Sequence, residues 1–216
     1  TQALELTFAI RRDDYTGFGT TTNPKVSFRY QPLASLMFRG SYNESFRAPS
    51  FNQLFNGITV TPYAGKDLAD PATCPGGKVN STRPGCEAVN PETYSGGKPD
   101  LGPETAKQAS LGVVFEPSNF FSASADLWEI RKENTIDSFN LATMLQNYAY
   151  FQAAFLRDPA TNALVAVDQR WINTGERRTR GVEVGARFNG KFSTGSLWSI
   201  GIDGSRLLEK KSRATT

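Results

Sequence analysis

The two cysteines are the residues whose type and spacing most clearly indicate a chemical role. Cys74 and Cys86 are the cysteines of the chain, and they lie in a stretch rich in proline and glycine. Two nearby cysteines suggest a disulfide in an oxidising compartment. Closing a loop of about 13 residues would contribute about 3 kcal/mol. The alternatives are two free thiols or half of a metal site, although the wide spacing without histidine is a poor zinc pattern.

Histidine is absent from the 216 residues. This excludes Ser-His-Asp and Cys-His catalysis and every histidine-ligated metal site within the chain. Carboxylates could still act as acid and base, but no pair stands out by its spacing. We therefore expect no enzyme activity, no catalytic residue, no metal site and no cofactor.

Aromatic and basic residues gather in two polar segments of the chain. Aromatic rings can stack on a ligand and arginine can bind anionic oxygens. Rings that pack one segment on the other would give the same pattern, so both interpretations stand. Residues 141–156 could form a short helix that carries part of this set. The candidate ligand contacts are Arg47, Tyr63, Arg83, Tyr94, Tyr148, Tyr150 and Phe151.

The charge balance and hydropathy exclude two classes of protein. Lys and Arg number 24 against 21 Asp and Glu, a net charge of +3. This balance is too mild to indicate a nucleic-acid partner. No apolar run approaches the ~18–20 residues of a membrane helix.

The elements that position these residues show a period of two. In residues 2–14, for example, Leu4, Leu6 and Phe8 alternate with polar neighbours. Such alternation is typical of a strand with two unlike faces. We expect a bulge or kink at Gly175, inside the longest of these strands. The predicted strands are 2–14, 22–31, 33–45, 104–116, 120–136, 164–190 and 196–208.

The connections between these strands alternate between short and long. The long connections, 45–103 and 137–163, fall at the same end of the predicted sheet. Short turns at one end and long loops at the other are typical of transmembrane β-barrels, whereas loops this long are uncommon in soluble domains. We predict an all-β antiparallel meander of about seven long strands, an open piece of a barrel. An antiparallel sheet with one wet face, as in a β-sandwich, is the alternative.

The two strand faces then acquire distinct surroundings. Leucine and phenylalanine side chains on the apolar face would contact lipid. The central parts of the strands carry no charge on this face. An Arg or Lys facing lipid at the middle of the bilayer would cost ~2–4 kcal/mol. Lys107 shares the apolar face near a strand end. Tyr15, Tyr30, Tyr42 and Phe46 lie where an aromatic girdle would sit. The residues expected to face the lumen are Arg11, Lys25, Arg29, Arg39, Glu183 and Arg187.

Four stretches of the chain together resemble the TonB-dependent outer-membrane receptors. They are residues 22–26, 43–55, 99–105 and 173–183, in the order and spacing that the family shows. The second stretch resembles the segment in which a barrel strand rises into an extracellular loop, and the third resembles the return into the barrel. The matching positions are Glu44, Phe46, Arg47, Pro49, Leu101, Pro103, Glu104, Asn173, Gly175, Gly181 and Glu183.

The resemblance implies a fold and a function. The family folds as a plugged barrel of about 22 strands, so residues 1–216 would be an internal fragment of that barrel, without the plug and the terminal strands. Residues 45–103 and 137–163 would be extracellular loops. The whole receptor would import a scarce nutrient, most often a ferric siderophore, across the outer membrane of a Gram-negative cell.

The resemblance also implies partners. They are outer-membrane lipid, a small nutrient ligand such as a ferric siderophore, and TonB, which acts through the missing plug; nucleic acid is not among them. The alternative function is a secreted β-sandwich module that binds carbohydrate or another ligand.

Overall fold

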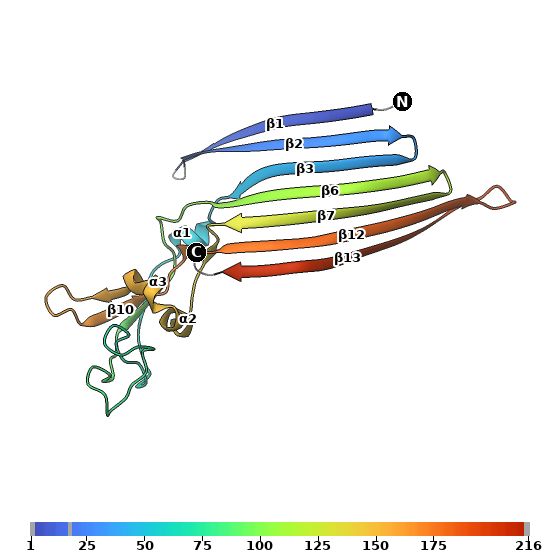
Figure 1. The fold of residues 1–216 in the computed structure, drawn as a ribbon. Helices are drawn as coiled ribbons and strands as arrows, with labels where there is room; N and C mark the ends of the chain where they lie inside the picture. Colours follow the sequence, from blue (N-terminus) through green and yellow to red (C-terminus); the bar gives the residue numbers. More distant parts are fainter. Residues whose placement is uncertain (1–2, 17–18, 214–216) are drawn as a thin grey trace.

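Seven long strands form one antiparallel sheet in the computed structural model, which describes residues 3–16 and 19–213. The sheet order is β1-β2-β3-β6-β7-β12-β13 (Figure 1). This confirms the predicted open antiparallel meander. The strand bounds are β1 (Ala3–Tyr15), β2 (Gly19–Leu33), β3 (Leu36–Arg47), β6 (Glu104–Ser118), β7 (Phe121–Glu133), β12 (Glu176–Lys191) and β13 (Leu197–Arg213).

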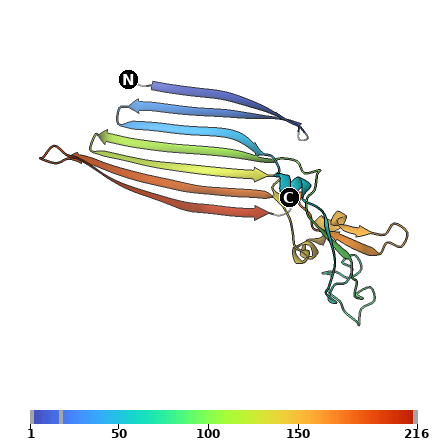
Figure 2. The same ribbon diagram turned by 180° about the vertical axis from the view of Figure 1, so that it is seen from behind.

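The long sheet is a single curved layer with the smaller elements gathered at one end (Figures 1 and 2). A β-sandwich would bury one face of each sheet against the other. Here large apolar side chains such as Phe8 and Ile10 remain 71% and 77% exposed. The sandwich alternative is therefore wrong in the described part of the chain, because no second sheet packs on this face.

Strand register divides the sheet into an apolar face and a polar face. Phe28, Leu111 and Leu127 follow one another across neighbouring strands on the apolar face, with Gly40 between the first two. On the polar face, Arg29, Arg39 and Asp126 lie in one row. Arg39 reaches over Gly112 to Asp126, with contacts of 2.8 and 2.6 Å. A Cβ at Gly112 would lie 2.0 Å from the Asp126 carboxylate, so this ion pair needs the glycine.

The apolar face carries a charge within its apolar rows that the sequence pattern did not predict. Arg206 of β13 is paired with Val182 of β12, whose side chain belongs to the apolar face. The expectation of uncharged strand cores is wrong at this position. It lies toward the loop end of the sheet, where a charge costs less than at the middle of a bilayer.

The predicted strand over 164–190 divides into three parts. They are β10 (Leu164–Asp168), β11 (Ile172–Asn173) and β12, which begins only at Glu176. Gly175 adopts a positive φ of 82° immediately before β12, so it ends the preceding segment rather than kinking a continuous strand. Leu164, Ala166 and Val167 are all buried, which shows that β10 lies inside a folded body.

The two long excursions from the sheet fold together into one body. We call residues 48–103 and 134–175 the loop body; its second part extends beyond the predicted 137–163. Its four-stranded sheet has the order β4-β5-β10-β9, in which β4 (Thr59–Pro62) and β5 (Glu92–Ser95) come from the first excursion. Strands β9 (Phe155–Arg157) and β10 come from the second, and β5 pairs with β10 in parallel.

Short helices and a small core complete the loop body. The helix predicted over 141–156 is broken at Asn147 into α2 (Leu141–Gln146) and α3 (Tyr148–Phe151), followed by the 3-10 turn η1 (Gln152–Ala154). The first excursion contributes α1 (Phe51–Phe55), and in the second excursion β8 (Ile136–Asp137) pairs with β11. The buried core consists of Met144, Phe151, Phe155, Leu164 and Val167.

Candidate functional site

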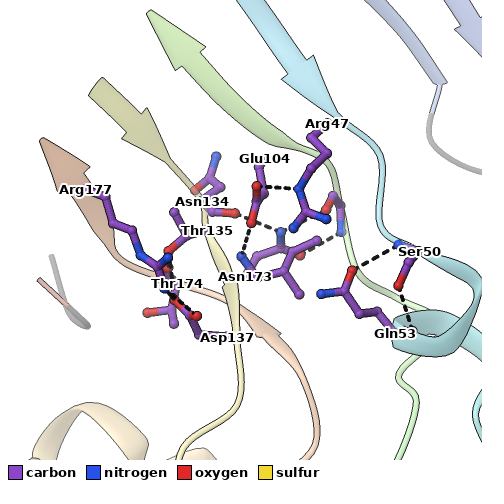
Figure 3. A network of polar contacts seen from close by, with 12 residues as sticks. Arg47, Ser50, Gln53, Glu104, Asn134, Thr135, Asp137, Asn173, Thr174 and Arg177 are labelled. Carbon is purple, nitrogen blue, oxygen red and sulfur yellow. Dashed lines mark hydrogen bonds and ion pairs between the residues drawn. The ribbon is translucent and has the colours of Figure 1, made fainter. Parts of the chain in front are cut away.

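A buried carboxylate joins the strands where both excursions leave the sheet. Arg47 Nε donates to Glu104 Oε2 at 2.7 Å, and the backbone N–H of Ile136 donates to Glu104 Oε1 at 2.8 Å. Figure 3 shows Glu104 between Arg47 and the segment that carries Thr135. Glu104 is only 8% exposed. Burial raises the pKa of Glu104, but these two donors outweigh it and hold the pKa below its usual range. The charged carboxylate therefore ties β3, β6 and β8 together.

Asn173 makes a second set of bonds at the same place. Its side chain accepts from the N–H of Gly102 at 2.7 Å and donates to the carbonyls of Gly102 and Asn134 at 2.8 and 3.1 Å. Thr135 Oγ1 donates to the Thr174 carbonyl at 2.7 Å (Figure 3). The Asn173 amide thus bridges the end of the first excursion and the start of the second.

Further contacts extend this junction in both directions. Arg177 at the start of β12 pairs with Asp137 at 2.6 Å. Ser50 caps α1, and its backbone N–H donates to the Gln53 side chain in a capping box. Leu54 packs with Leu101, Ile136 and Trp171 in a second, smaller core of the loop body. This junction therefore brings together several positions of the family pattern, namely Arg47, Leu101, Glu104 and Asn173.

Two links stabilise the loop body itself. Cys74 and Cys86 form a disulfide packed against buried Ala69. Asp70 of the first excursion accepts two bonds, of 2.7 and 2.6 Å, from Arg157 of the second. The Arg157 guanidinium lowers the pKa of Asp70, against the opposing effect of partial burial, and helps keep it ionised. This bidentate ion pair joins segments 87 residues apart.

The candidate ligand contacts occupy different environments. Phe151 is 3% exposed and belongs to the core, and Tyr148 packs edge-on against Phe155 at 5.1 Å between ring centroids. Tyr63 and Tyr94 donate to the neighbouring carboxylates Asp67 and Glu92.

The other candidates lie nearer the surface. The Tyr150 hydroxyl is hydrogen-bonded to that of Thr174, while its ring borders a hollow of 270 Å³. Arg83 is exposed on the disulfide loop, whereas Arg47 is held by Glu104. The structure therefore supports packing for Phe151 and leaves Arg83 open to solvent.

The sequence pattern did not predict an apolar patch that is exposed on α1 and the segment after it. Phe51 and Phe55 are 82% and 64% exposed, and their rings lie 5.9 Å apart on α1. Ile58 and Val60 are also exposed in the segment that follows. The capping-box residues Ser50 and Gln53, with two phenylalanines four positions apart, are a signal that could have indicated this one-turn helix.

The polar face of the long sheet is hollowed near its middle. Two adjoining hollows of about 240 and 320 Å³ share Arg39, Ser124 and Asp203 in their walls. Small residues, including Gly185, make room for them, while Glu183 and Arg187 add charge at the borders. This face presents water-compatible groups, as a barrel lumen requires.

Within 3–16 and 19–213, no group of three or more cysteine, aspartate or glutamate side chains is arranged to hold a metal ion. In the same ranges, no helix has the length and apolar character needed to cross a membrane.

A long antiparallel sheet with one apolar and one polar face, bearing an elaborate body at one end, defines the wall of an outer-membrane β-barrel. The family described as TonB dependent receptor-like, beta-barrel, matches residues 1–211. The chain therefore belongs to the TonB-dependent receptor family. Its members reside in the Gram-negative outer membrane and are transporters rather than enzymes.

Solved structures share this fold at low sequence identity. The siderophore receptor PirA from Acinetobacter baumannii aligns with a TM-score of 0.64 and 15% identity, covering 95% of this chain and 25% of that one. A variant of the ferric enterobactin receptor PfeA from Pseudomonas aeruginosa gives 0.61 and 16%, covering 95% and 24%. The RagAB peptide transporter gives 0.50 and 12%, covering 94% and 20%.

The chain spans about a quarter of the length of the first two of these receptors. None of the curated proteins matches the chain.

Proposed function

We propose that the chain forms part of an outer-membrane transporter that imports a ferric siderophore. The observation that carries this proposal is the loop body, which stands at one end of a sheet whose polar face belongs to the barrel lumen. Loops at the end of a rigid scaffold are the usual place for ligand capture. The loop body would face the outside of the cell, and the excursions 48–103 and 134–175 would be its extracellular loops.

The surface chemistry of the loop body supports this class of ligand. Phe51 and Phe55 offer exposed rings for stacking, and the exposed Arg83 and nearby Lys78 offer positive charge. Aromatic and cationic groups together suit an anionic iron complex with planar organic arms. Similar folds occur in proteins described as siderophore and ferric enterobactin receptors. Transport would draw its energy from TonB through the plug of the whole receptor.

Uptake of radioactive iron tests this proposal. Iron-limited cells that express the receptor carrying this chain should accumulate iron from a cognate siderophore, and cells lacking TonB should not. Arg83→Gln should weaken siderophore binding by about tenfold, as expected for the loss of one charge-assisted contact. Lys191→Gln, at the opposite end of β12, is the matched control and should bind normally. Iron uptake that is unchanged by deletion of the receptor would contradict the proposal.

Peptide import is the second candidate function. The likeness to the RagAB peptide transporter and the exposed apolar patch of Phe51, Phe55, Ile58 and Val60 favour it. A labelled oligopeptide mixture added to the same cells separates the two. Receptor-dependent peptide uptake without siderophore uptake would replace the first proposal with the second.

A further inference from the structure

A row of basic residues crosses the apolar face of the sheet at its loop end. Lys107 of β6 is paired with Arg131 of β7, Arg131 with Arg178 of β12, and Arg178 with Lys211 of β13. We call these four residues the cationic row. Like charges directly opposite each other on neighbouring strands are destabilising, so the row needs a compensating negative charge.

Carboxylates beside the row supply part of that charge. Arg131 pairs with Glu176 at 2.8 Å, Arg178 with Glu129 at 2.7 Å, and Lys211 with Glu209 at 2.6 Å. Lys107 is held more loosely, 3.7 Å from Glu133. The side chains of the row nevertheless remain between 40% and 66% exposed.

Cations outnumber carboxylates on this part of the apolar face. Strand register places Arg180 and Arg213 on the same face, each two positions from a member of the cationic row. The carboxylates that share the face are Glu44, Glu129, Glu133, Glu176 and Glu209. An excess of positive charge therefore remains available to an external anion.

The height of the row relative to the apolar surface identifies its surroundings. On β6, β7 and β12, each basic residue lies four positions beyond the apolar Leu111, Leu127 and Val182. Four residues of strand rise by about 13 Å. Crossing the bilayer core takes about 9–11 residues from the short turns, so the row lies at the level of the lipid headgroups. This step rests on the proposed function, which places the loop body outside the cell. The headgroups at the level of the row are then those of the outer leaflet.

We propose that the cationic row binds the phosphates of a phosphorylated glycolipid in the outer leaflet. Adjacent strands lie about 4.8 Å apart, so the row extends for about 14 Å from Lys107 to Lys211. That length exceeds one phosphodiester and matches a headgroup that carries two phosphates on linked sugars. The neighbouring carboxylates keep the basic side chains ordered before the lipid arrives.

The test removes two cations without leaving a carboxylate unpaired. In Lys107→Gln/Lys211→Gln, Glu133 keeps Arg131, and Glu209 keeps Arg180 at 2.8 Å. The matched control is Lys132→Gln/Lys210→Gln, which removes the same charge from the same region of β7 and β13 but from the polar face. The purified whole receptor in neutral detergent is titrated with bisphosphorylated lipid A. The first variant should bind about 30-fold more weakly, since each cation near an anionic surface contributes about fivefold, and the control should bind within twofold of wild type.

Equal weakening in both variants, or none in the first, would overturn the proposal. Phosphatidylglycerol and dephosphorylated lipid A should each bind at least tenfold more weakly to wild type than the bisphosphorylated glycolipid; equal binding would overturn the assignment to a glycolipid phosphate. Heat-dependent gel mobility checks that each variant is folded.

If the first variant does not fold, the salt dependence of wild-type binding remains a test, because affinity that does not fall with ionic strength contradicts a phosphate contact. Nutrient uptake is measured separately. If the wild-type receptor binds the glycolipid normally but imports no nutrient, the proposed function is refuted. If it imports the nutrient but does not bind the glycolipid, only the role of the cationic row is refuted.

Discussion

Glu104 is the residue on which the junction between sheet and loop body depends. It accepts bonds from Arg47 and from the backbone of Ile136, which belong to different strands. The family resemblance marks Arg47 and Glu104, but nothing in a single sequence pairs two residues that are 57 positions apart. The expected ligand role for Arg47 stays a prediction, while its ion pair gives it a structural role.

Replacing Glu104 with Gln should loosen the junction. The ion pair with Arg47 is lost and Glu104 is buried, so we expect a local cost of about 2 kcal/mol. Hydrogen exchange at the Ile136 amide should become about 30-fold faster. Glu116→Gln, an exposed glutamate near the other end of β6, is the control. Unchanged exchange in Glu104→Gln would show that the carboxylate is dispensable.

Asp70 gives the loop body a dependence on pH. Because Arg157 holds its pKa below the unfolded value of about 3.9, the ionised pair stabilises the folded state fully above pH 5. That stability is lost as the pH falls through the folded pKa, since the unfolded chain then binds the proton more readily. Hydrogen exchange of loop-body amides, corrected for intrinsic rates, should be constant from pH 7 to 5 and rise below about pH 4.

Asp70→Asn should flatten part of this dependence. The pKa values of Glu104, Asp158 and Asp168 are lowered as well, so the variant should retain the remainder of the acid sensitivity. A variant with the full wild-type pH profile would exclude the Asp70–Arg157 pair as a contributor.

At the scale of elements, the period of two predicted the long strands because each strand separates lipid-facing from lumen-facing residues. The prediction of one continuous strand was wrong over residues 164–175, where successive side chains are buried on both faces of the strand. Leu164, Ala166 and Val167 pack inside the loop body. Their parallel partner β5 lies some 70 residues earlier, a pairing that local pattern cannot reveal.

The Cys74–Cys86 disulfide should stabilise the loop body and leave the long sheet unaffected. Removing a bridge over a loop of this size costs about 3 kcal/mol. In Cys74→Ser/Cys86→Ser, trypsin should cut after Lys78, inside the loop that the bridge closes, far more readily, while the strands stay protected. Alkylation before and after reduction, read by mass spectrometry, checks the bridge. Two alkylated thiols without reductant would show that it does not form.

Phe155 tests whether the two excursions fold as one unit. Phe155→Ala removes a ring from the core and should destabilise the loop body by about 3–5 kcal/mol. Because the strands of both excursions share one sheet, cleavage should rise in residues 48–103 as well as in 134–175. Phe55→Ala, which alters an exposed ring, should change neither. Cleavage confined to the second excursion would show that the two fold independently.

At the scale of the whole molecule, one face of the sheet is apolar and the other is polar, as a wall between lipid and water requires. Alternation predicts two unlike faces, and the alternating short and long connections favour a barrel wall. The open sheet is predicted from the family resemblance, because seven strands are far fewer than a barrel of the family's size requires. Cooperation between the excursions could not be predicted, since it depends on contacts between segments distant along the chain.

Spin labels placed one at a time along β7, from Phe121 to Glu133, test the two-faced wall most directly. In the receptor embedded in its membrane, labels at Phe121, Ala123, Ala125 and Leu127 should collide with oxygen dissolved in lipid. Labels at Ser122, Ser124 and Asp126 should collide instead with a water-soluble relaxation agent, so accessibility should alternate with a period of two. Uniform accessibility, or water contact at Leu127 and lipid contact at Asp126, would contradict the assignment of β7 to a barrel wall.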